Sequence, residues 1–254
     1  MTDDALLDVL SEAAAAVRTA LDGLDDWGPA GTRPGQYHSD VVADVAAIDV
    51  LRRAGLGVLS EETGPHDSGR DLIVALDPVD GSTNAARGLP WYATSLCVVD
   101  DRGARVALVV NQATGERFDA VRGEGARRNG GPMAPTTCTR LSDAVLGLTG
   151  YPPADLGWRQ MRALGAAALD LCAVACGHFD AYIDCSVHAH SPWDYLGGML
   201  VCQEAGAHVA EAGGRDLVTM GWRDRRVPVA AATPELLANA VQARKAFPVP
   251  ATAA

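Results

Sequence analysis

Aromatic residues are scarce in this chain: phenylalanine, tyrosine and tryptophan make up 5% of its 254 residues. An interior with few large rings must be filled by smaller side chains. Because alanine is abundant, we expect helices that pack closely together. Hydrophobic residues account for 48% of the sequence, which is enough for a large core, in one large domain or in two smaller ones that share contacts.

Positive charge is also in short supply. The chain has 21 basic and 32 acidic residues, a net charge of -11 and a pI of about 4.9. Such a field repels nucleic acid and anionic membranes, so we expect neither as a partner. It also repels an anionic substrate unless bound cations or fixed dipoles offset it locally.

Two further features are missing from the sequence: a long apolar run and a basic N-terminal leader. No run approaches the length of a membrane span, and the first residues are acidic where a signal peptide would be basic. We therefore expect a cytoplasmic protein.

The cysteines form neither a CxxC pair nor a zinc-binding spacing, so we interpret them as free, mostly buried thiols in a reducing compartment. They are Cys97, Cys138, Cys172, Cys176, Cys185 and Cys202.

Hydrophobic periodicity predicts two helices first, over residues 6–24 and 41–51, with Val41, Val45, Ile48 and Leu51 sharing the buried face of the second. Short strands joined by turns follow over residues 72–122, and helices and strands alternate after the loop-like residues 132–135. We predict a layered α/β (α+β) fold.

We place a domain boundary at the loop-like stretch. Residues 1–135 would form an α+β domain with an antiparallel sheet, and residues 136–254 an α/β domain.

The stretch LDPVDGSTN (residues 76–84) combines two kinds of site. Asp77 and Asp80, three apart across a turn, can converge with the Val79 carbonyl on a hard cation such as Mg2+. The amides of residues 81–83 can bind an anion where a helix begins. The alternative for this stretch alone is an ordinary turn.

Two more acidic clusters strengthen the metal interpretation, although each alone could be a helix cap or a solvated charge. Glu61 and Glu62 stand in SEETG, after a predicted strand, and Asp194 stands in SPWD, at the start of a predicted helix. With one carboxylate from each of these two clusters, Asp77 and Asp80 would complete a set of four carboxylates for two magnesium ions.

The motifs SEETG, LDPVDGSTN and SPWDYLGG, in this order, resemble the three signature motifs of the inositol monophosphatase family. The segment LGAAALDLCAVACGHFDAYID resembles a fourth stretch of that family. The resemblance extends from the first helix to about residue 245. It implies an αβαβα architecture, a Mg2+-dependent, lithium-sensitive phosphatase with two to three ions per site, and a homodimer.

The resemblance also implies roles for individual residues. It gives metal ligands, a pair that positions the attacking water, a partner for the Ser82 hydroxyl, and residues that bind phosphate or substrate. The metal ligands are Glu61, Asp77, the Val79 carbonyl, Asp80 and Asp194; the water pair is Glu61 and Ser82, with Asp44 as the partner of Ser82; the binding residues are Gly81, Ser82, Thr83, Gly165, Ala166 and Asp184.

The chain departs from the family pattern at several places. Ser60 replaces a glycine, Ala85 replaces an aromatic residue, and Gly197–Gly198 replaces Ala-Gly. The usual lysine before the second helix is absent, so His38 or Arg33 would substitute for it. The loop of residues 185–191 is longer than usual and carries His188 and His190, either as a polar loop or as a lip that contacts substrate.

We therefore expect a phosphatase of small phosphomonoesters, with inositol monophosphate as the substrate. Histidinol phosphate is the first alternative, and a nucleotide substrate such as phosphoadenosine phosphate is the second. A different class, a weakly catalytic protein-binding module, also stays open because some bacterial members of the family bind the transcription machinery.

Overall fold

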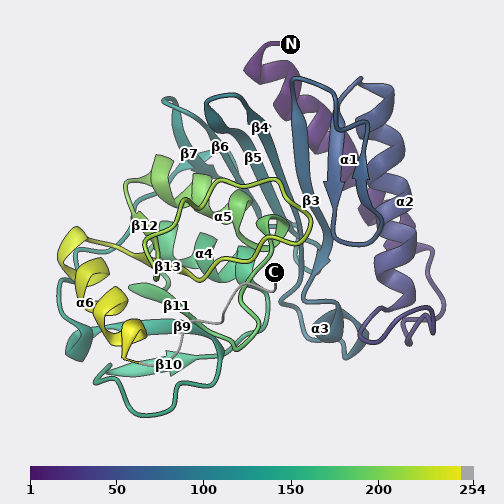
Figure 1. Cartoon of the computed structure of the whole chain (residues 1–254). Helices are drawn as coiled ribbons and strands as arrows, with labels where there is room; N and C mark the ends of the chain where they lie inside the picture. Colours follow the sequence, from purple (N-terminus) through teal and green to yellow (C-terminus); the bar gives the residue numbers. More distant parts are fainter. Residues whose placement is uncertain (247–254) are drawn as a thin grey trace.

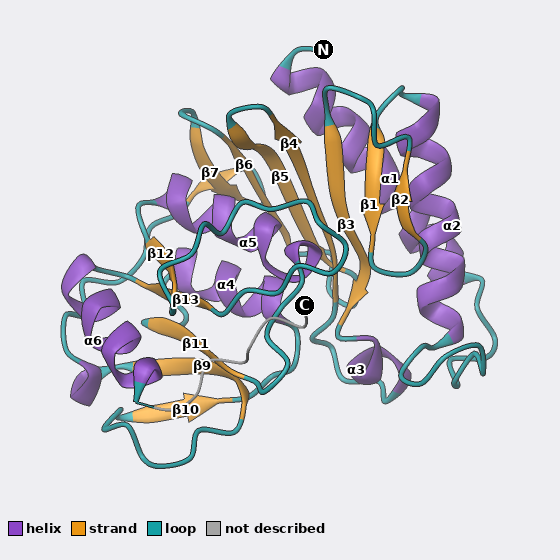
Figure 2. Ribbon diagram, in the orientation of Figure 1, coloured by secondary structure: helices purple, strands orange, loops and turns teal. Residues whose placement is uncertain are grey.

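The computed structural model describes residues 1–246. Its helices and sheets are arranged in five layers (Figures 1 and 2). Helices α1 and α2 cover one face of a large sheet, and α4 and α5 lie between that sheet and a smaller one. Helix α6 packs on the outer face of the small sheet. The predicted layered α/β fold is confirmed. Among the described residues, no helix is both long and apolar enough to cross a membrane.

The N-terminal layer consists of α1 (Asp3–Asp22) and α2 (His38–Arg53). Leu6, Leu10 and Val17 of α1 are buried as their helical spacing predicts. The predicted face of α2 is only partly right: Leu51 is buried, but Val41 and Val45 are 38% and 66% exposed. Most of the buried face consists of serine, alanine and aspartate, and these short side chains let α2 pack closely on α1 and the large sheet.

The large sheet has eight strands in the order β2-β1-β3-β4-β5-β6-β7-β8. Only β1 and β3 pair in parallel; the other neighbours are antiparallel, as a meander requires. The strands are β1 (Gly57–Ser60), β2 (Gly64–His66), β3 (Ile73–Asp80), β4 (Ala93–Asp100), β5 (Gly103–Asn111), β6 (Arg117–Val121), β7 (Gly125–Arg128) and β8 (Gly131–Pro132), with the short helix α3 (Ser82–Ala86) after β3.

The small sheet has five strands in the order β10-β9-β11-β13-β12. Its elements are the 3-10 turn η1 (Leu141–Asp143), β9 (Val145–Gly150), β10 (Gln160–Arg162), α4 (Ala167–Ala175), β11 (Ala181–Cys185), α5 (Pro192–Ala205), β12 (His208–Glu211), β13 (Pro228–Ala231) and α6 (Pro234–Lys245). Thr233 caps α6 with Pro234 in its first turn, and Gly206 ends α5 in the left-handed region.

The two sheets share one hydrophobic core. Buried residues of the large sheet, among them Leu59 and Ala107, belong to the same cluster as Leu169 of α4, Leu196 of α5 and Ala230 of β13. The change of sheet falls between residues 132 and 145, close to the predicted boundary at residue 135. Because the core continues across this point, the division into two domains stays a prediction.

Candidate metal and phosphate site

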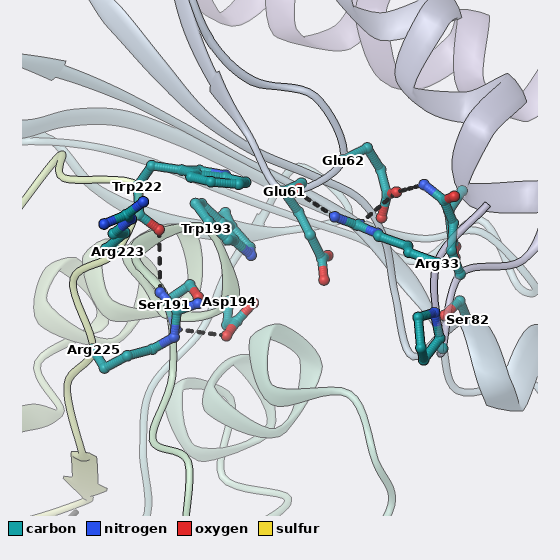
Figure 3. Close-up of a pocket in the computed structure, with 14 residues that line it drawn as sticks. Arg33, Glu61, Glu62, Ser82, Ser191, Trp193, Asp194, Trp222, Arg223 and Arg225 are labelled. Carbon is teal, nitrogen blue, oxygen red and sulfur yellow. Dashed lines mark hydrogen bonds and ion pairs between the residues drawn. The ribbon is translucent and has the colours of Figure 1, made fainter. Parts of the chain in front are cut away.

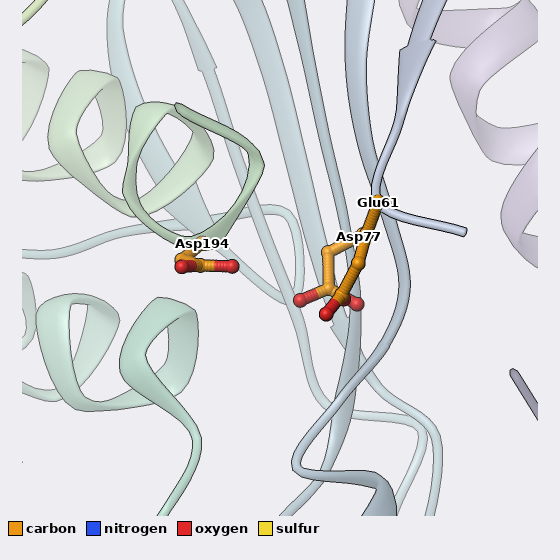
Figure 4. A group of neighbouring side chains, drawn as sticks. All are labelled: Glu61, Asp77 and Asp194. Carbon is orange, nitrogen blue, oxygen red and sulfur yellow. The ribbon is translucent and has the colours of Figure 1, made fainter. Parts of the chain in front are cut away.

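Three carboxylates from three different elements meet at one point of the fold. Ligand atoms of Glu61, Asp77 and Asp194 all lie within 4.8 Å of one another. Glu61 directly follows β1, Asp77 lies in β3, and Asp194 lies in the first turn of α5 and points toward the other two (Figure 4). The site therefore joins the large sheet to a helix from the second half of the chain.

The local structure explains how these side chains converge. Strands β1 and β3 are parallel, with Ser60 opposite Leu76. The next residue of each segment, Glu61 or Asp77, therefore lies beside the other at the same end of the sheet. Asp194 is fixed by a capping box in which its carboxylate accepts a hydrogen bond from the Ser191 amide at 2.8 Å. Both arrangements depend on short, contiguous motifs.

Burial and repulsion between like charges raise the pKa values of Glu61 and Asp77. The pKa values of Glu61 and Asp77 lie well above normal, first because the carboxylates are desolvated and then because like charges surround them. Crowded, buried carboxylates of this kind are a suitable donor set for a hard divalent cation, which binds oxygen ligands and removes the repulsion. The predicted metal role of these residues therefore fits the geometry.

Asp80 stands slightly apart from this three-residue cluster but lines the same pocket. Its carboxylate accepts hydrogen bonds from the amides of Ala167 and Ala168, at 3.2 and 2.7 Å, in the first turn of α4. Desolvation and the charge of Asp194 nevertheless raise the pKa of Asp80 to about 7. Its role as a fourth metal ligand stays a prediction.

The turn after Asp80 packs closely against the segments of Trp91 and Gly165. Gly81 has a φ of 88°, and a Cβ atom there would lie 3.0 Å from the Trp91 carbonyl oxygen. The amides of Asn84 and Ala85 already bond to the Gly81 carbonyl. Gly81 and Ser82 line the pocket beside the carboxylates, whereas Thr83 is exposed and its hydroxyl lies 3.2 Å from that of Tyr37.

The predicted partner of Ser82 needs correction. The Asp44 carboxylate bonds instead to the hydroxyls of Ser60, in a short contact, and of Thr63 at 2.9 Å. The residue that meets the Ser82 hydroxyl is Asp40, one helical turn earlier, and burial raises its pKa to about 6. Sequence reasoning missed Asp40. Its carboxylate accepts a hydrogen bond from the Tyr37 amide at 2.8 Å at the start of α2, a contact that only the structure shows.

The opposite wall of the pocket differs from the predicted substrate contacts. Gly165 lines it, but Ala166 and Asp184 are fully buried and do not. His190 lines it instead, with its Nε2 atom 2.7 Å from the Tyr182 hydroxyl and 3.9 Å from Asp184. The hydroxyl of Tyr182 also donates to Thr149 at 2.8 Å, which fixes this wall.

Three other departures from the family pattern concern the missing lysine, His188 and Ala85. Arg33, not His38, reaches the site: its guanidinium lies 2.6 Å from Glu62, whereas His38 lies 3.2 Å from Asp26. His188 does not line the pocket described above. Ala85 is buried in the core under α1 and α2, so it forms no pocket wall.

Two connected pockets surround the cluster. The inner pocket, about 230 Å3, contains the predicted metal and phosphate residues together with Thr149 and His190. The second, which we call the arginine pocket, is about 430 Å3 and is lined by Arg33, Asp40, Trp193, Trp222, Arg223 and Arg225, among others (Figure 3). Glu61, Ser82 and Asp194 line both pockets.

Known proteins share this sequence pattern and fold. The sequence model of the inositol monophosphatase family matches residues 40–246. A protein of Archaeoglobus fulgidus named fructose-1,6-bisphosphatase/inositol-1-monophosphatase is 35% identical over 184 residues, which are 70% of this chain and 71% of the relative. The Nus factor SuhB of Escherichia coli (strain K12) is 30% identical over 201 residues, 72% and 74% of the two chains. The structure of inositol monophosphatase from Anabaena (Nostoc) sp. PCC 7120 superimposes with a TM-score of 0.79 at 25% identity, over 96% of this chain and 97% of that one.

Proposed function

Because this chain belongs to the inositol monophosphatase family, a phosphatase family, we propose that it is a Mg2+-dependent phosphomonoesterase that acts on inositol monophosphate. The observation that carries the proposal is the meeting of Glu61, Asp77 and Asp194 within 4.8 Å, beside the Gly81–Ser82 turn. Carboxylates placed there would otherwise repel both one another and a phosphate ester.

The metal would be held by Glu61, Asp77, the Val79 carbonyl, Asp80 and Asp194. When bound, Mg2+ supplies positive charge that offsets the carboxylates and the phosphate oxygens and lowers the pKa of water. Carboxylate and carbonyl oxygens suit this ion. The bound cation would therefore offset the acidic charge of the chain at the position where the phosphate ester binds.

The chain's own groups then have separate tasks. The amides of Gly81 and Ser82 would hold the phosphate oxygens. Glu61 and the Ser82–Asp40 pair would orient the attacking water and accept its proton. The ester P–O bond breaks as the water oxygen bonds to phosphorus; one water proton ends on the alcohol and the other stays on the released phosphate.

The wall formed by Thr149, Gly165 and His190 would face the alcohol part of the substrate. Its polar groups can donate hydrogen bonds to hydroxyls, which favours a polyol over an apolar alcohol. Histidinol phosphate is the alternative substrate. We further propose that the protein is a cytoplasmic homodimer.

The test is phosphate release with Mg2+ from a panel that includes inositol monophosphate, histidinol phosphate, fructose 1,6-bisphosphate and phosphoadenosine phosphate. We expect the highest kcat/KM on inositol monophosphate. The Asp77→Asn variant should lose at least ~100-fold in kcat because a metal ligand is removed. The matched variant Asp71→Asn, an exposed acid just before the same strand, should keep the wild-type rate.

Circular dichroism should show that the wild-type and variant proteins are folded. If the folded wild type then releases phosphate from none of these substrates, the proposed phosphatase activity is refuted. A stoichiometric macromolecular partner found together with that result would favour the protein-binding alternative. A near wild-type rate for Asp77→Asn would refute the metal role alone.

A further inference from the structure

The arginine pocket brings three arginines beside four acids, Asp40, Glu61, Glu62 and Asp194, in a strongly acidic chain. Its arginines come from two distant segments: Arg33 from the loop before α2, and Arg223 and Arg225 from the loop between β12 and β13 (Figure 3). The net charge of the chain is -11. Cations gathered beside the phosphate-binding turn therefore oppose the general field of the protein.

Two of these arginines are not neutralised by an acid. Arg33 is paired with Glu62, but neither Arg223 nor Arg225 has a carboxylate partner within residues 1–246. Arg225 is held in place by the carbonyls of Trp222 and Asp224, which both accept from Nη1, and its guanidinium lies 5.9 Å from the centre of the Trp193 ring. A fixed guanidinium with unused donors is well suited to bind an oxyanion.

The two pockets share Glu61, Ser82 and Asp194 but differ in their other lining residues. The Asp40–Ser82 pair, which would activate water, lines the arginine pocket, whereas Thr149 and His190 line only the inner pocket. In phosphoryl transfer the attacking and leaving oxygens are roughly in line, on opposite sides of phosphorus. The alcohol therefore departs on the inner side, and phosphorus moves toward the arginine side as the new bond forms.

We propose that the arginine pocket is a second oxyanion site, formed by Arg223 and Arg225, which receives inorganic phosphate as it leaves the catalytic position. The source of the phosphate rests on the proposed function, but the site itself does not. Two products that leave in opposite directions do not block each other. A weak anion site formed by the arginines would draw phosphate away from the metal-binding residues, two of which, Glu61 and Asp194, also border this pocket.

Calorimetric titration of the Mg2+-loaded protein with inorganic phosphate tests the proposal directly. We expect two phosphates per wild-type chain and one in the Arg223→Ala/Arg225→Ala variant. The control is Arg102→Ala/Arg140→Ala, which removes the same charge from two exposed arginines outside both pockets. The control should behave as wild type.

One phosphate in the wild type, or two in the Arg223→Ala/Arg225→Ala variant, would overturn the proposal. If that variant unfolds because Arg225 contacts Trp193, Arg223→Ala alone should still weaken the second phosphate, since Arg223 is exposed. The titration needs no turnover. Two phosphates in a protein that hydrolyses nothing would leave this site standing and refute the proposed function.

Discussion

Asp40 and Asp44 stand one helical turn apart on the buried face of α2, yet they serve different neighbours. Asp44 ties α2 to the loop after β1 through Ser60 and Thr63. Asp40 faces Ser82 and the arginine pocket. The first contact is structural, because it fixes the strand end that carries Glu61, and we propose that the second serves the chemistry.

The two aspartates should therefore respond differently to the same substitution. We expect Asp40→Asn to lower kcat by ~100-fold or more, the scale of a lost acid–base group, with little change in melting temperature. Asp44→Asn should lower the melting temperature by several degrees and change kcat far less, because it weakens a buried hydrogen-bonded contact. Steady-state kinetics and thermal denaturation of both variants decide, and the reverse pattern would restore Asp44 as the partner of Ser82.

The difference between Asp40 and Asp44 also shows which parts of the site can be predicted from the sequence. Glu61, Asp77 and Asp194 lie in short motifs at strand or helix ends, and their convergence could be predicted. Choosing Asp40 over Asp44 requires the rotation of α2 about its axis. The helical spacing of Val41 and Val45 suggests that they face the core. Both are exposed, however, and alanines fill the close contact with α1.

At the scale of elements, the five-residue helix α3 links two segments that line the inner pocket, the Gly81–Ser82 turn and the Gly165 turn. The Asn84 side chain donates to the carbonyls of Trp91 and Leu164, at 2.8 and 2.7 Å, and so holds α3 against the Gly165 turn. Helix α5 also packs closely: a Cβ at Gly197 would lie 2.7 Å from Ser95 Oγ. This contact explains why glycine stands there, but it depends on distant strands and could not be read from the motif.

The crowding at the start of α3 predicts a specific effect of Gly81→Ala. The new Cβ would have a left-handed φ and would press on Trp91 and Gly165, so we expect a loss of about 2–4 kcal/mol of stability and weaker phosphate binding. Gly88→Ala is the matched control, since it has a φ of 69° but open space around its Cβ, and it should cost only about 1 kcal/mol. Equal losses in chemical denaturation would show that crowding at Gly81 is unimportant.

At the scale of the whole molecule, the acid cluster joins the two halves of the chain. Glu61 and Asp77 belong to the large sheet and Asp194 to α5, which packs between the sheets. The layers could be predicted from alternating apolar segments. The shared core and the edge strand β10, whose three residues are all exposed, could not, because they depend on contacts between distant segments.

This arrangement predicts a pH-dependent stabilisation by Mg2+. In the metal-free protein the pKa of Asp80 is raised from 3.8 to about 7, and those of Glu61 and Asp77 are also raised. The folded state then binds more protons than the unfolded state above about pH 4, so stability falls as the pH rises toward 7 and beyond. Mg2+ neutralises the ionised carboxylates, so it should raise the melting temperature by several degrees at about pH 8 and much less at about pH 5. Differential scanning fluorimetry of wild type, Asp77→Asn and Asp71→Asn checks this: only Asp77→Asn should lose the shift, and an equal Mg2+ effect at both pH values would place the cation elsewhere.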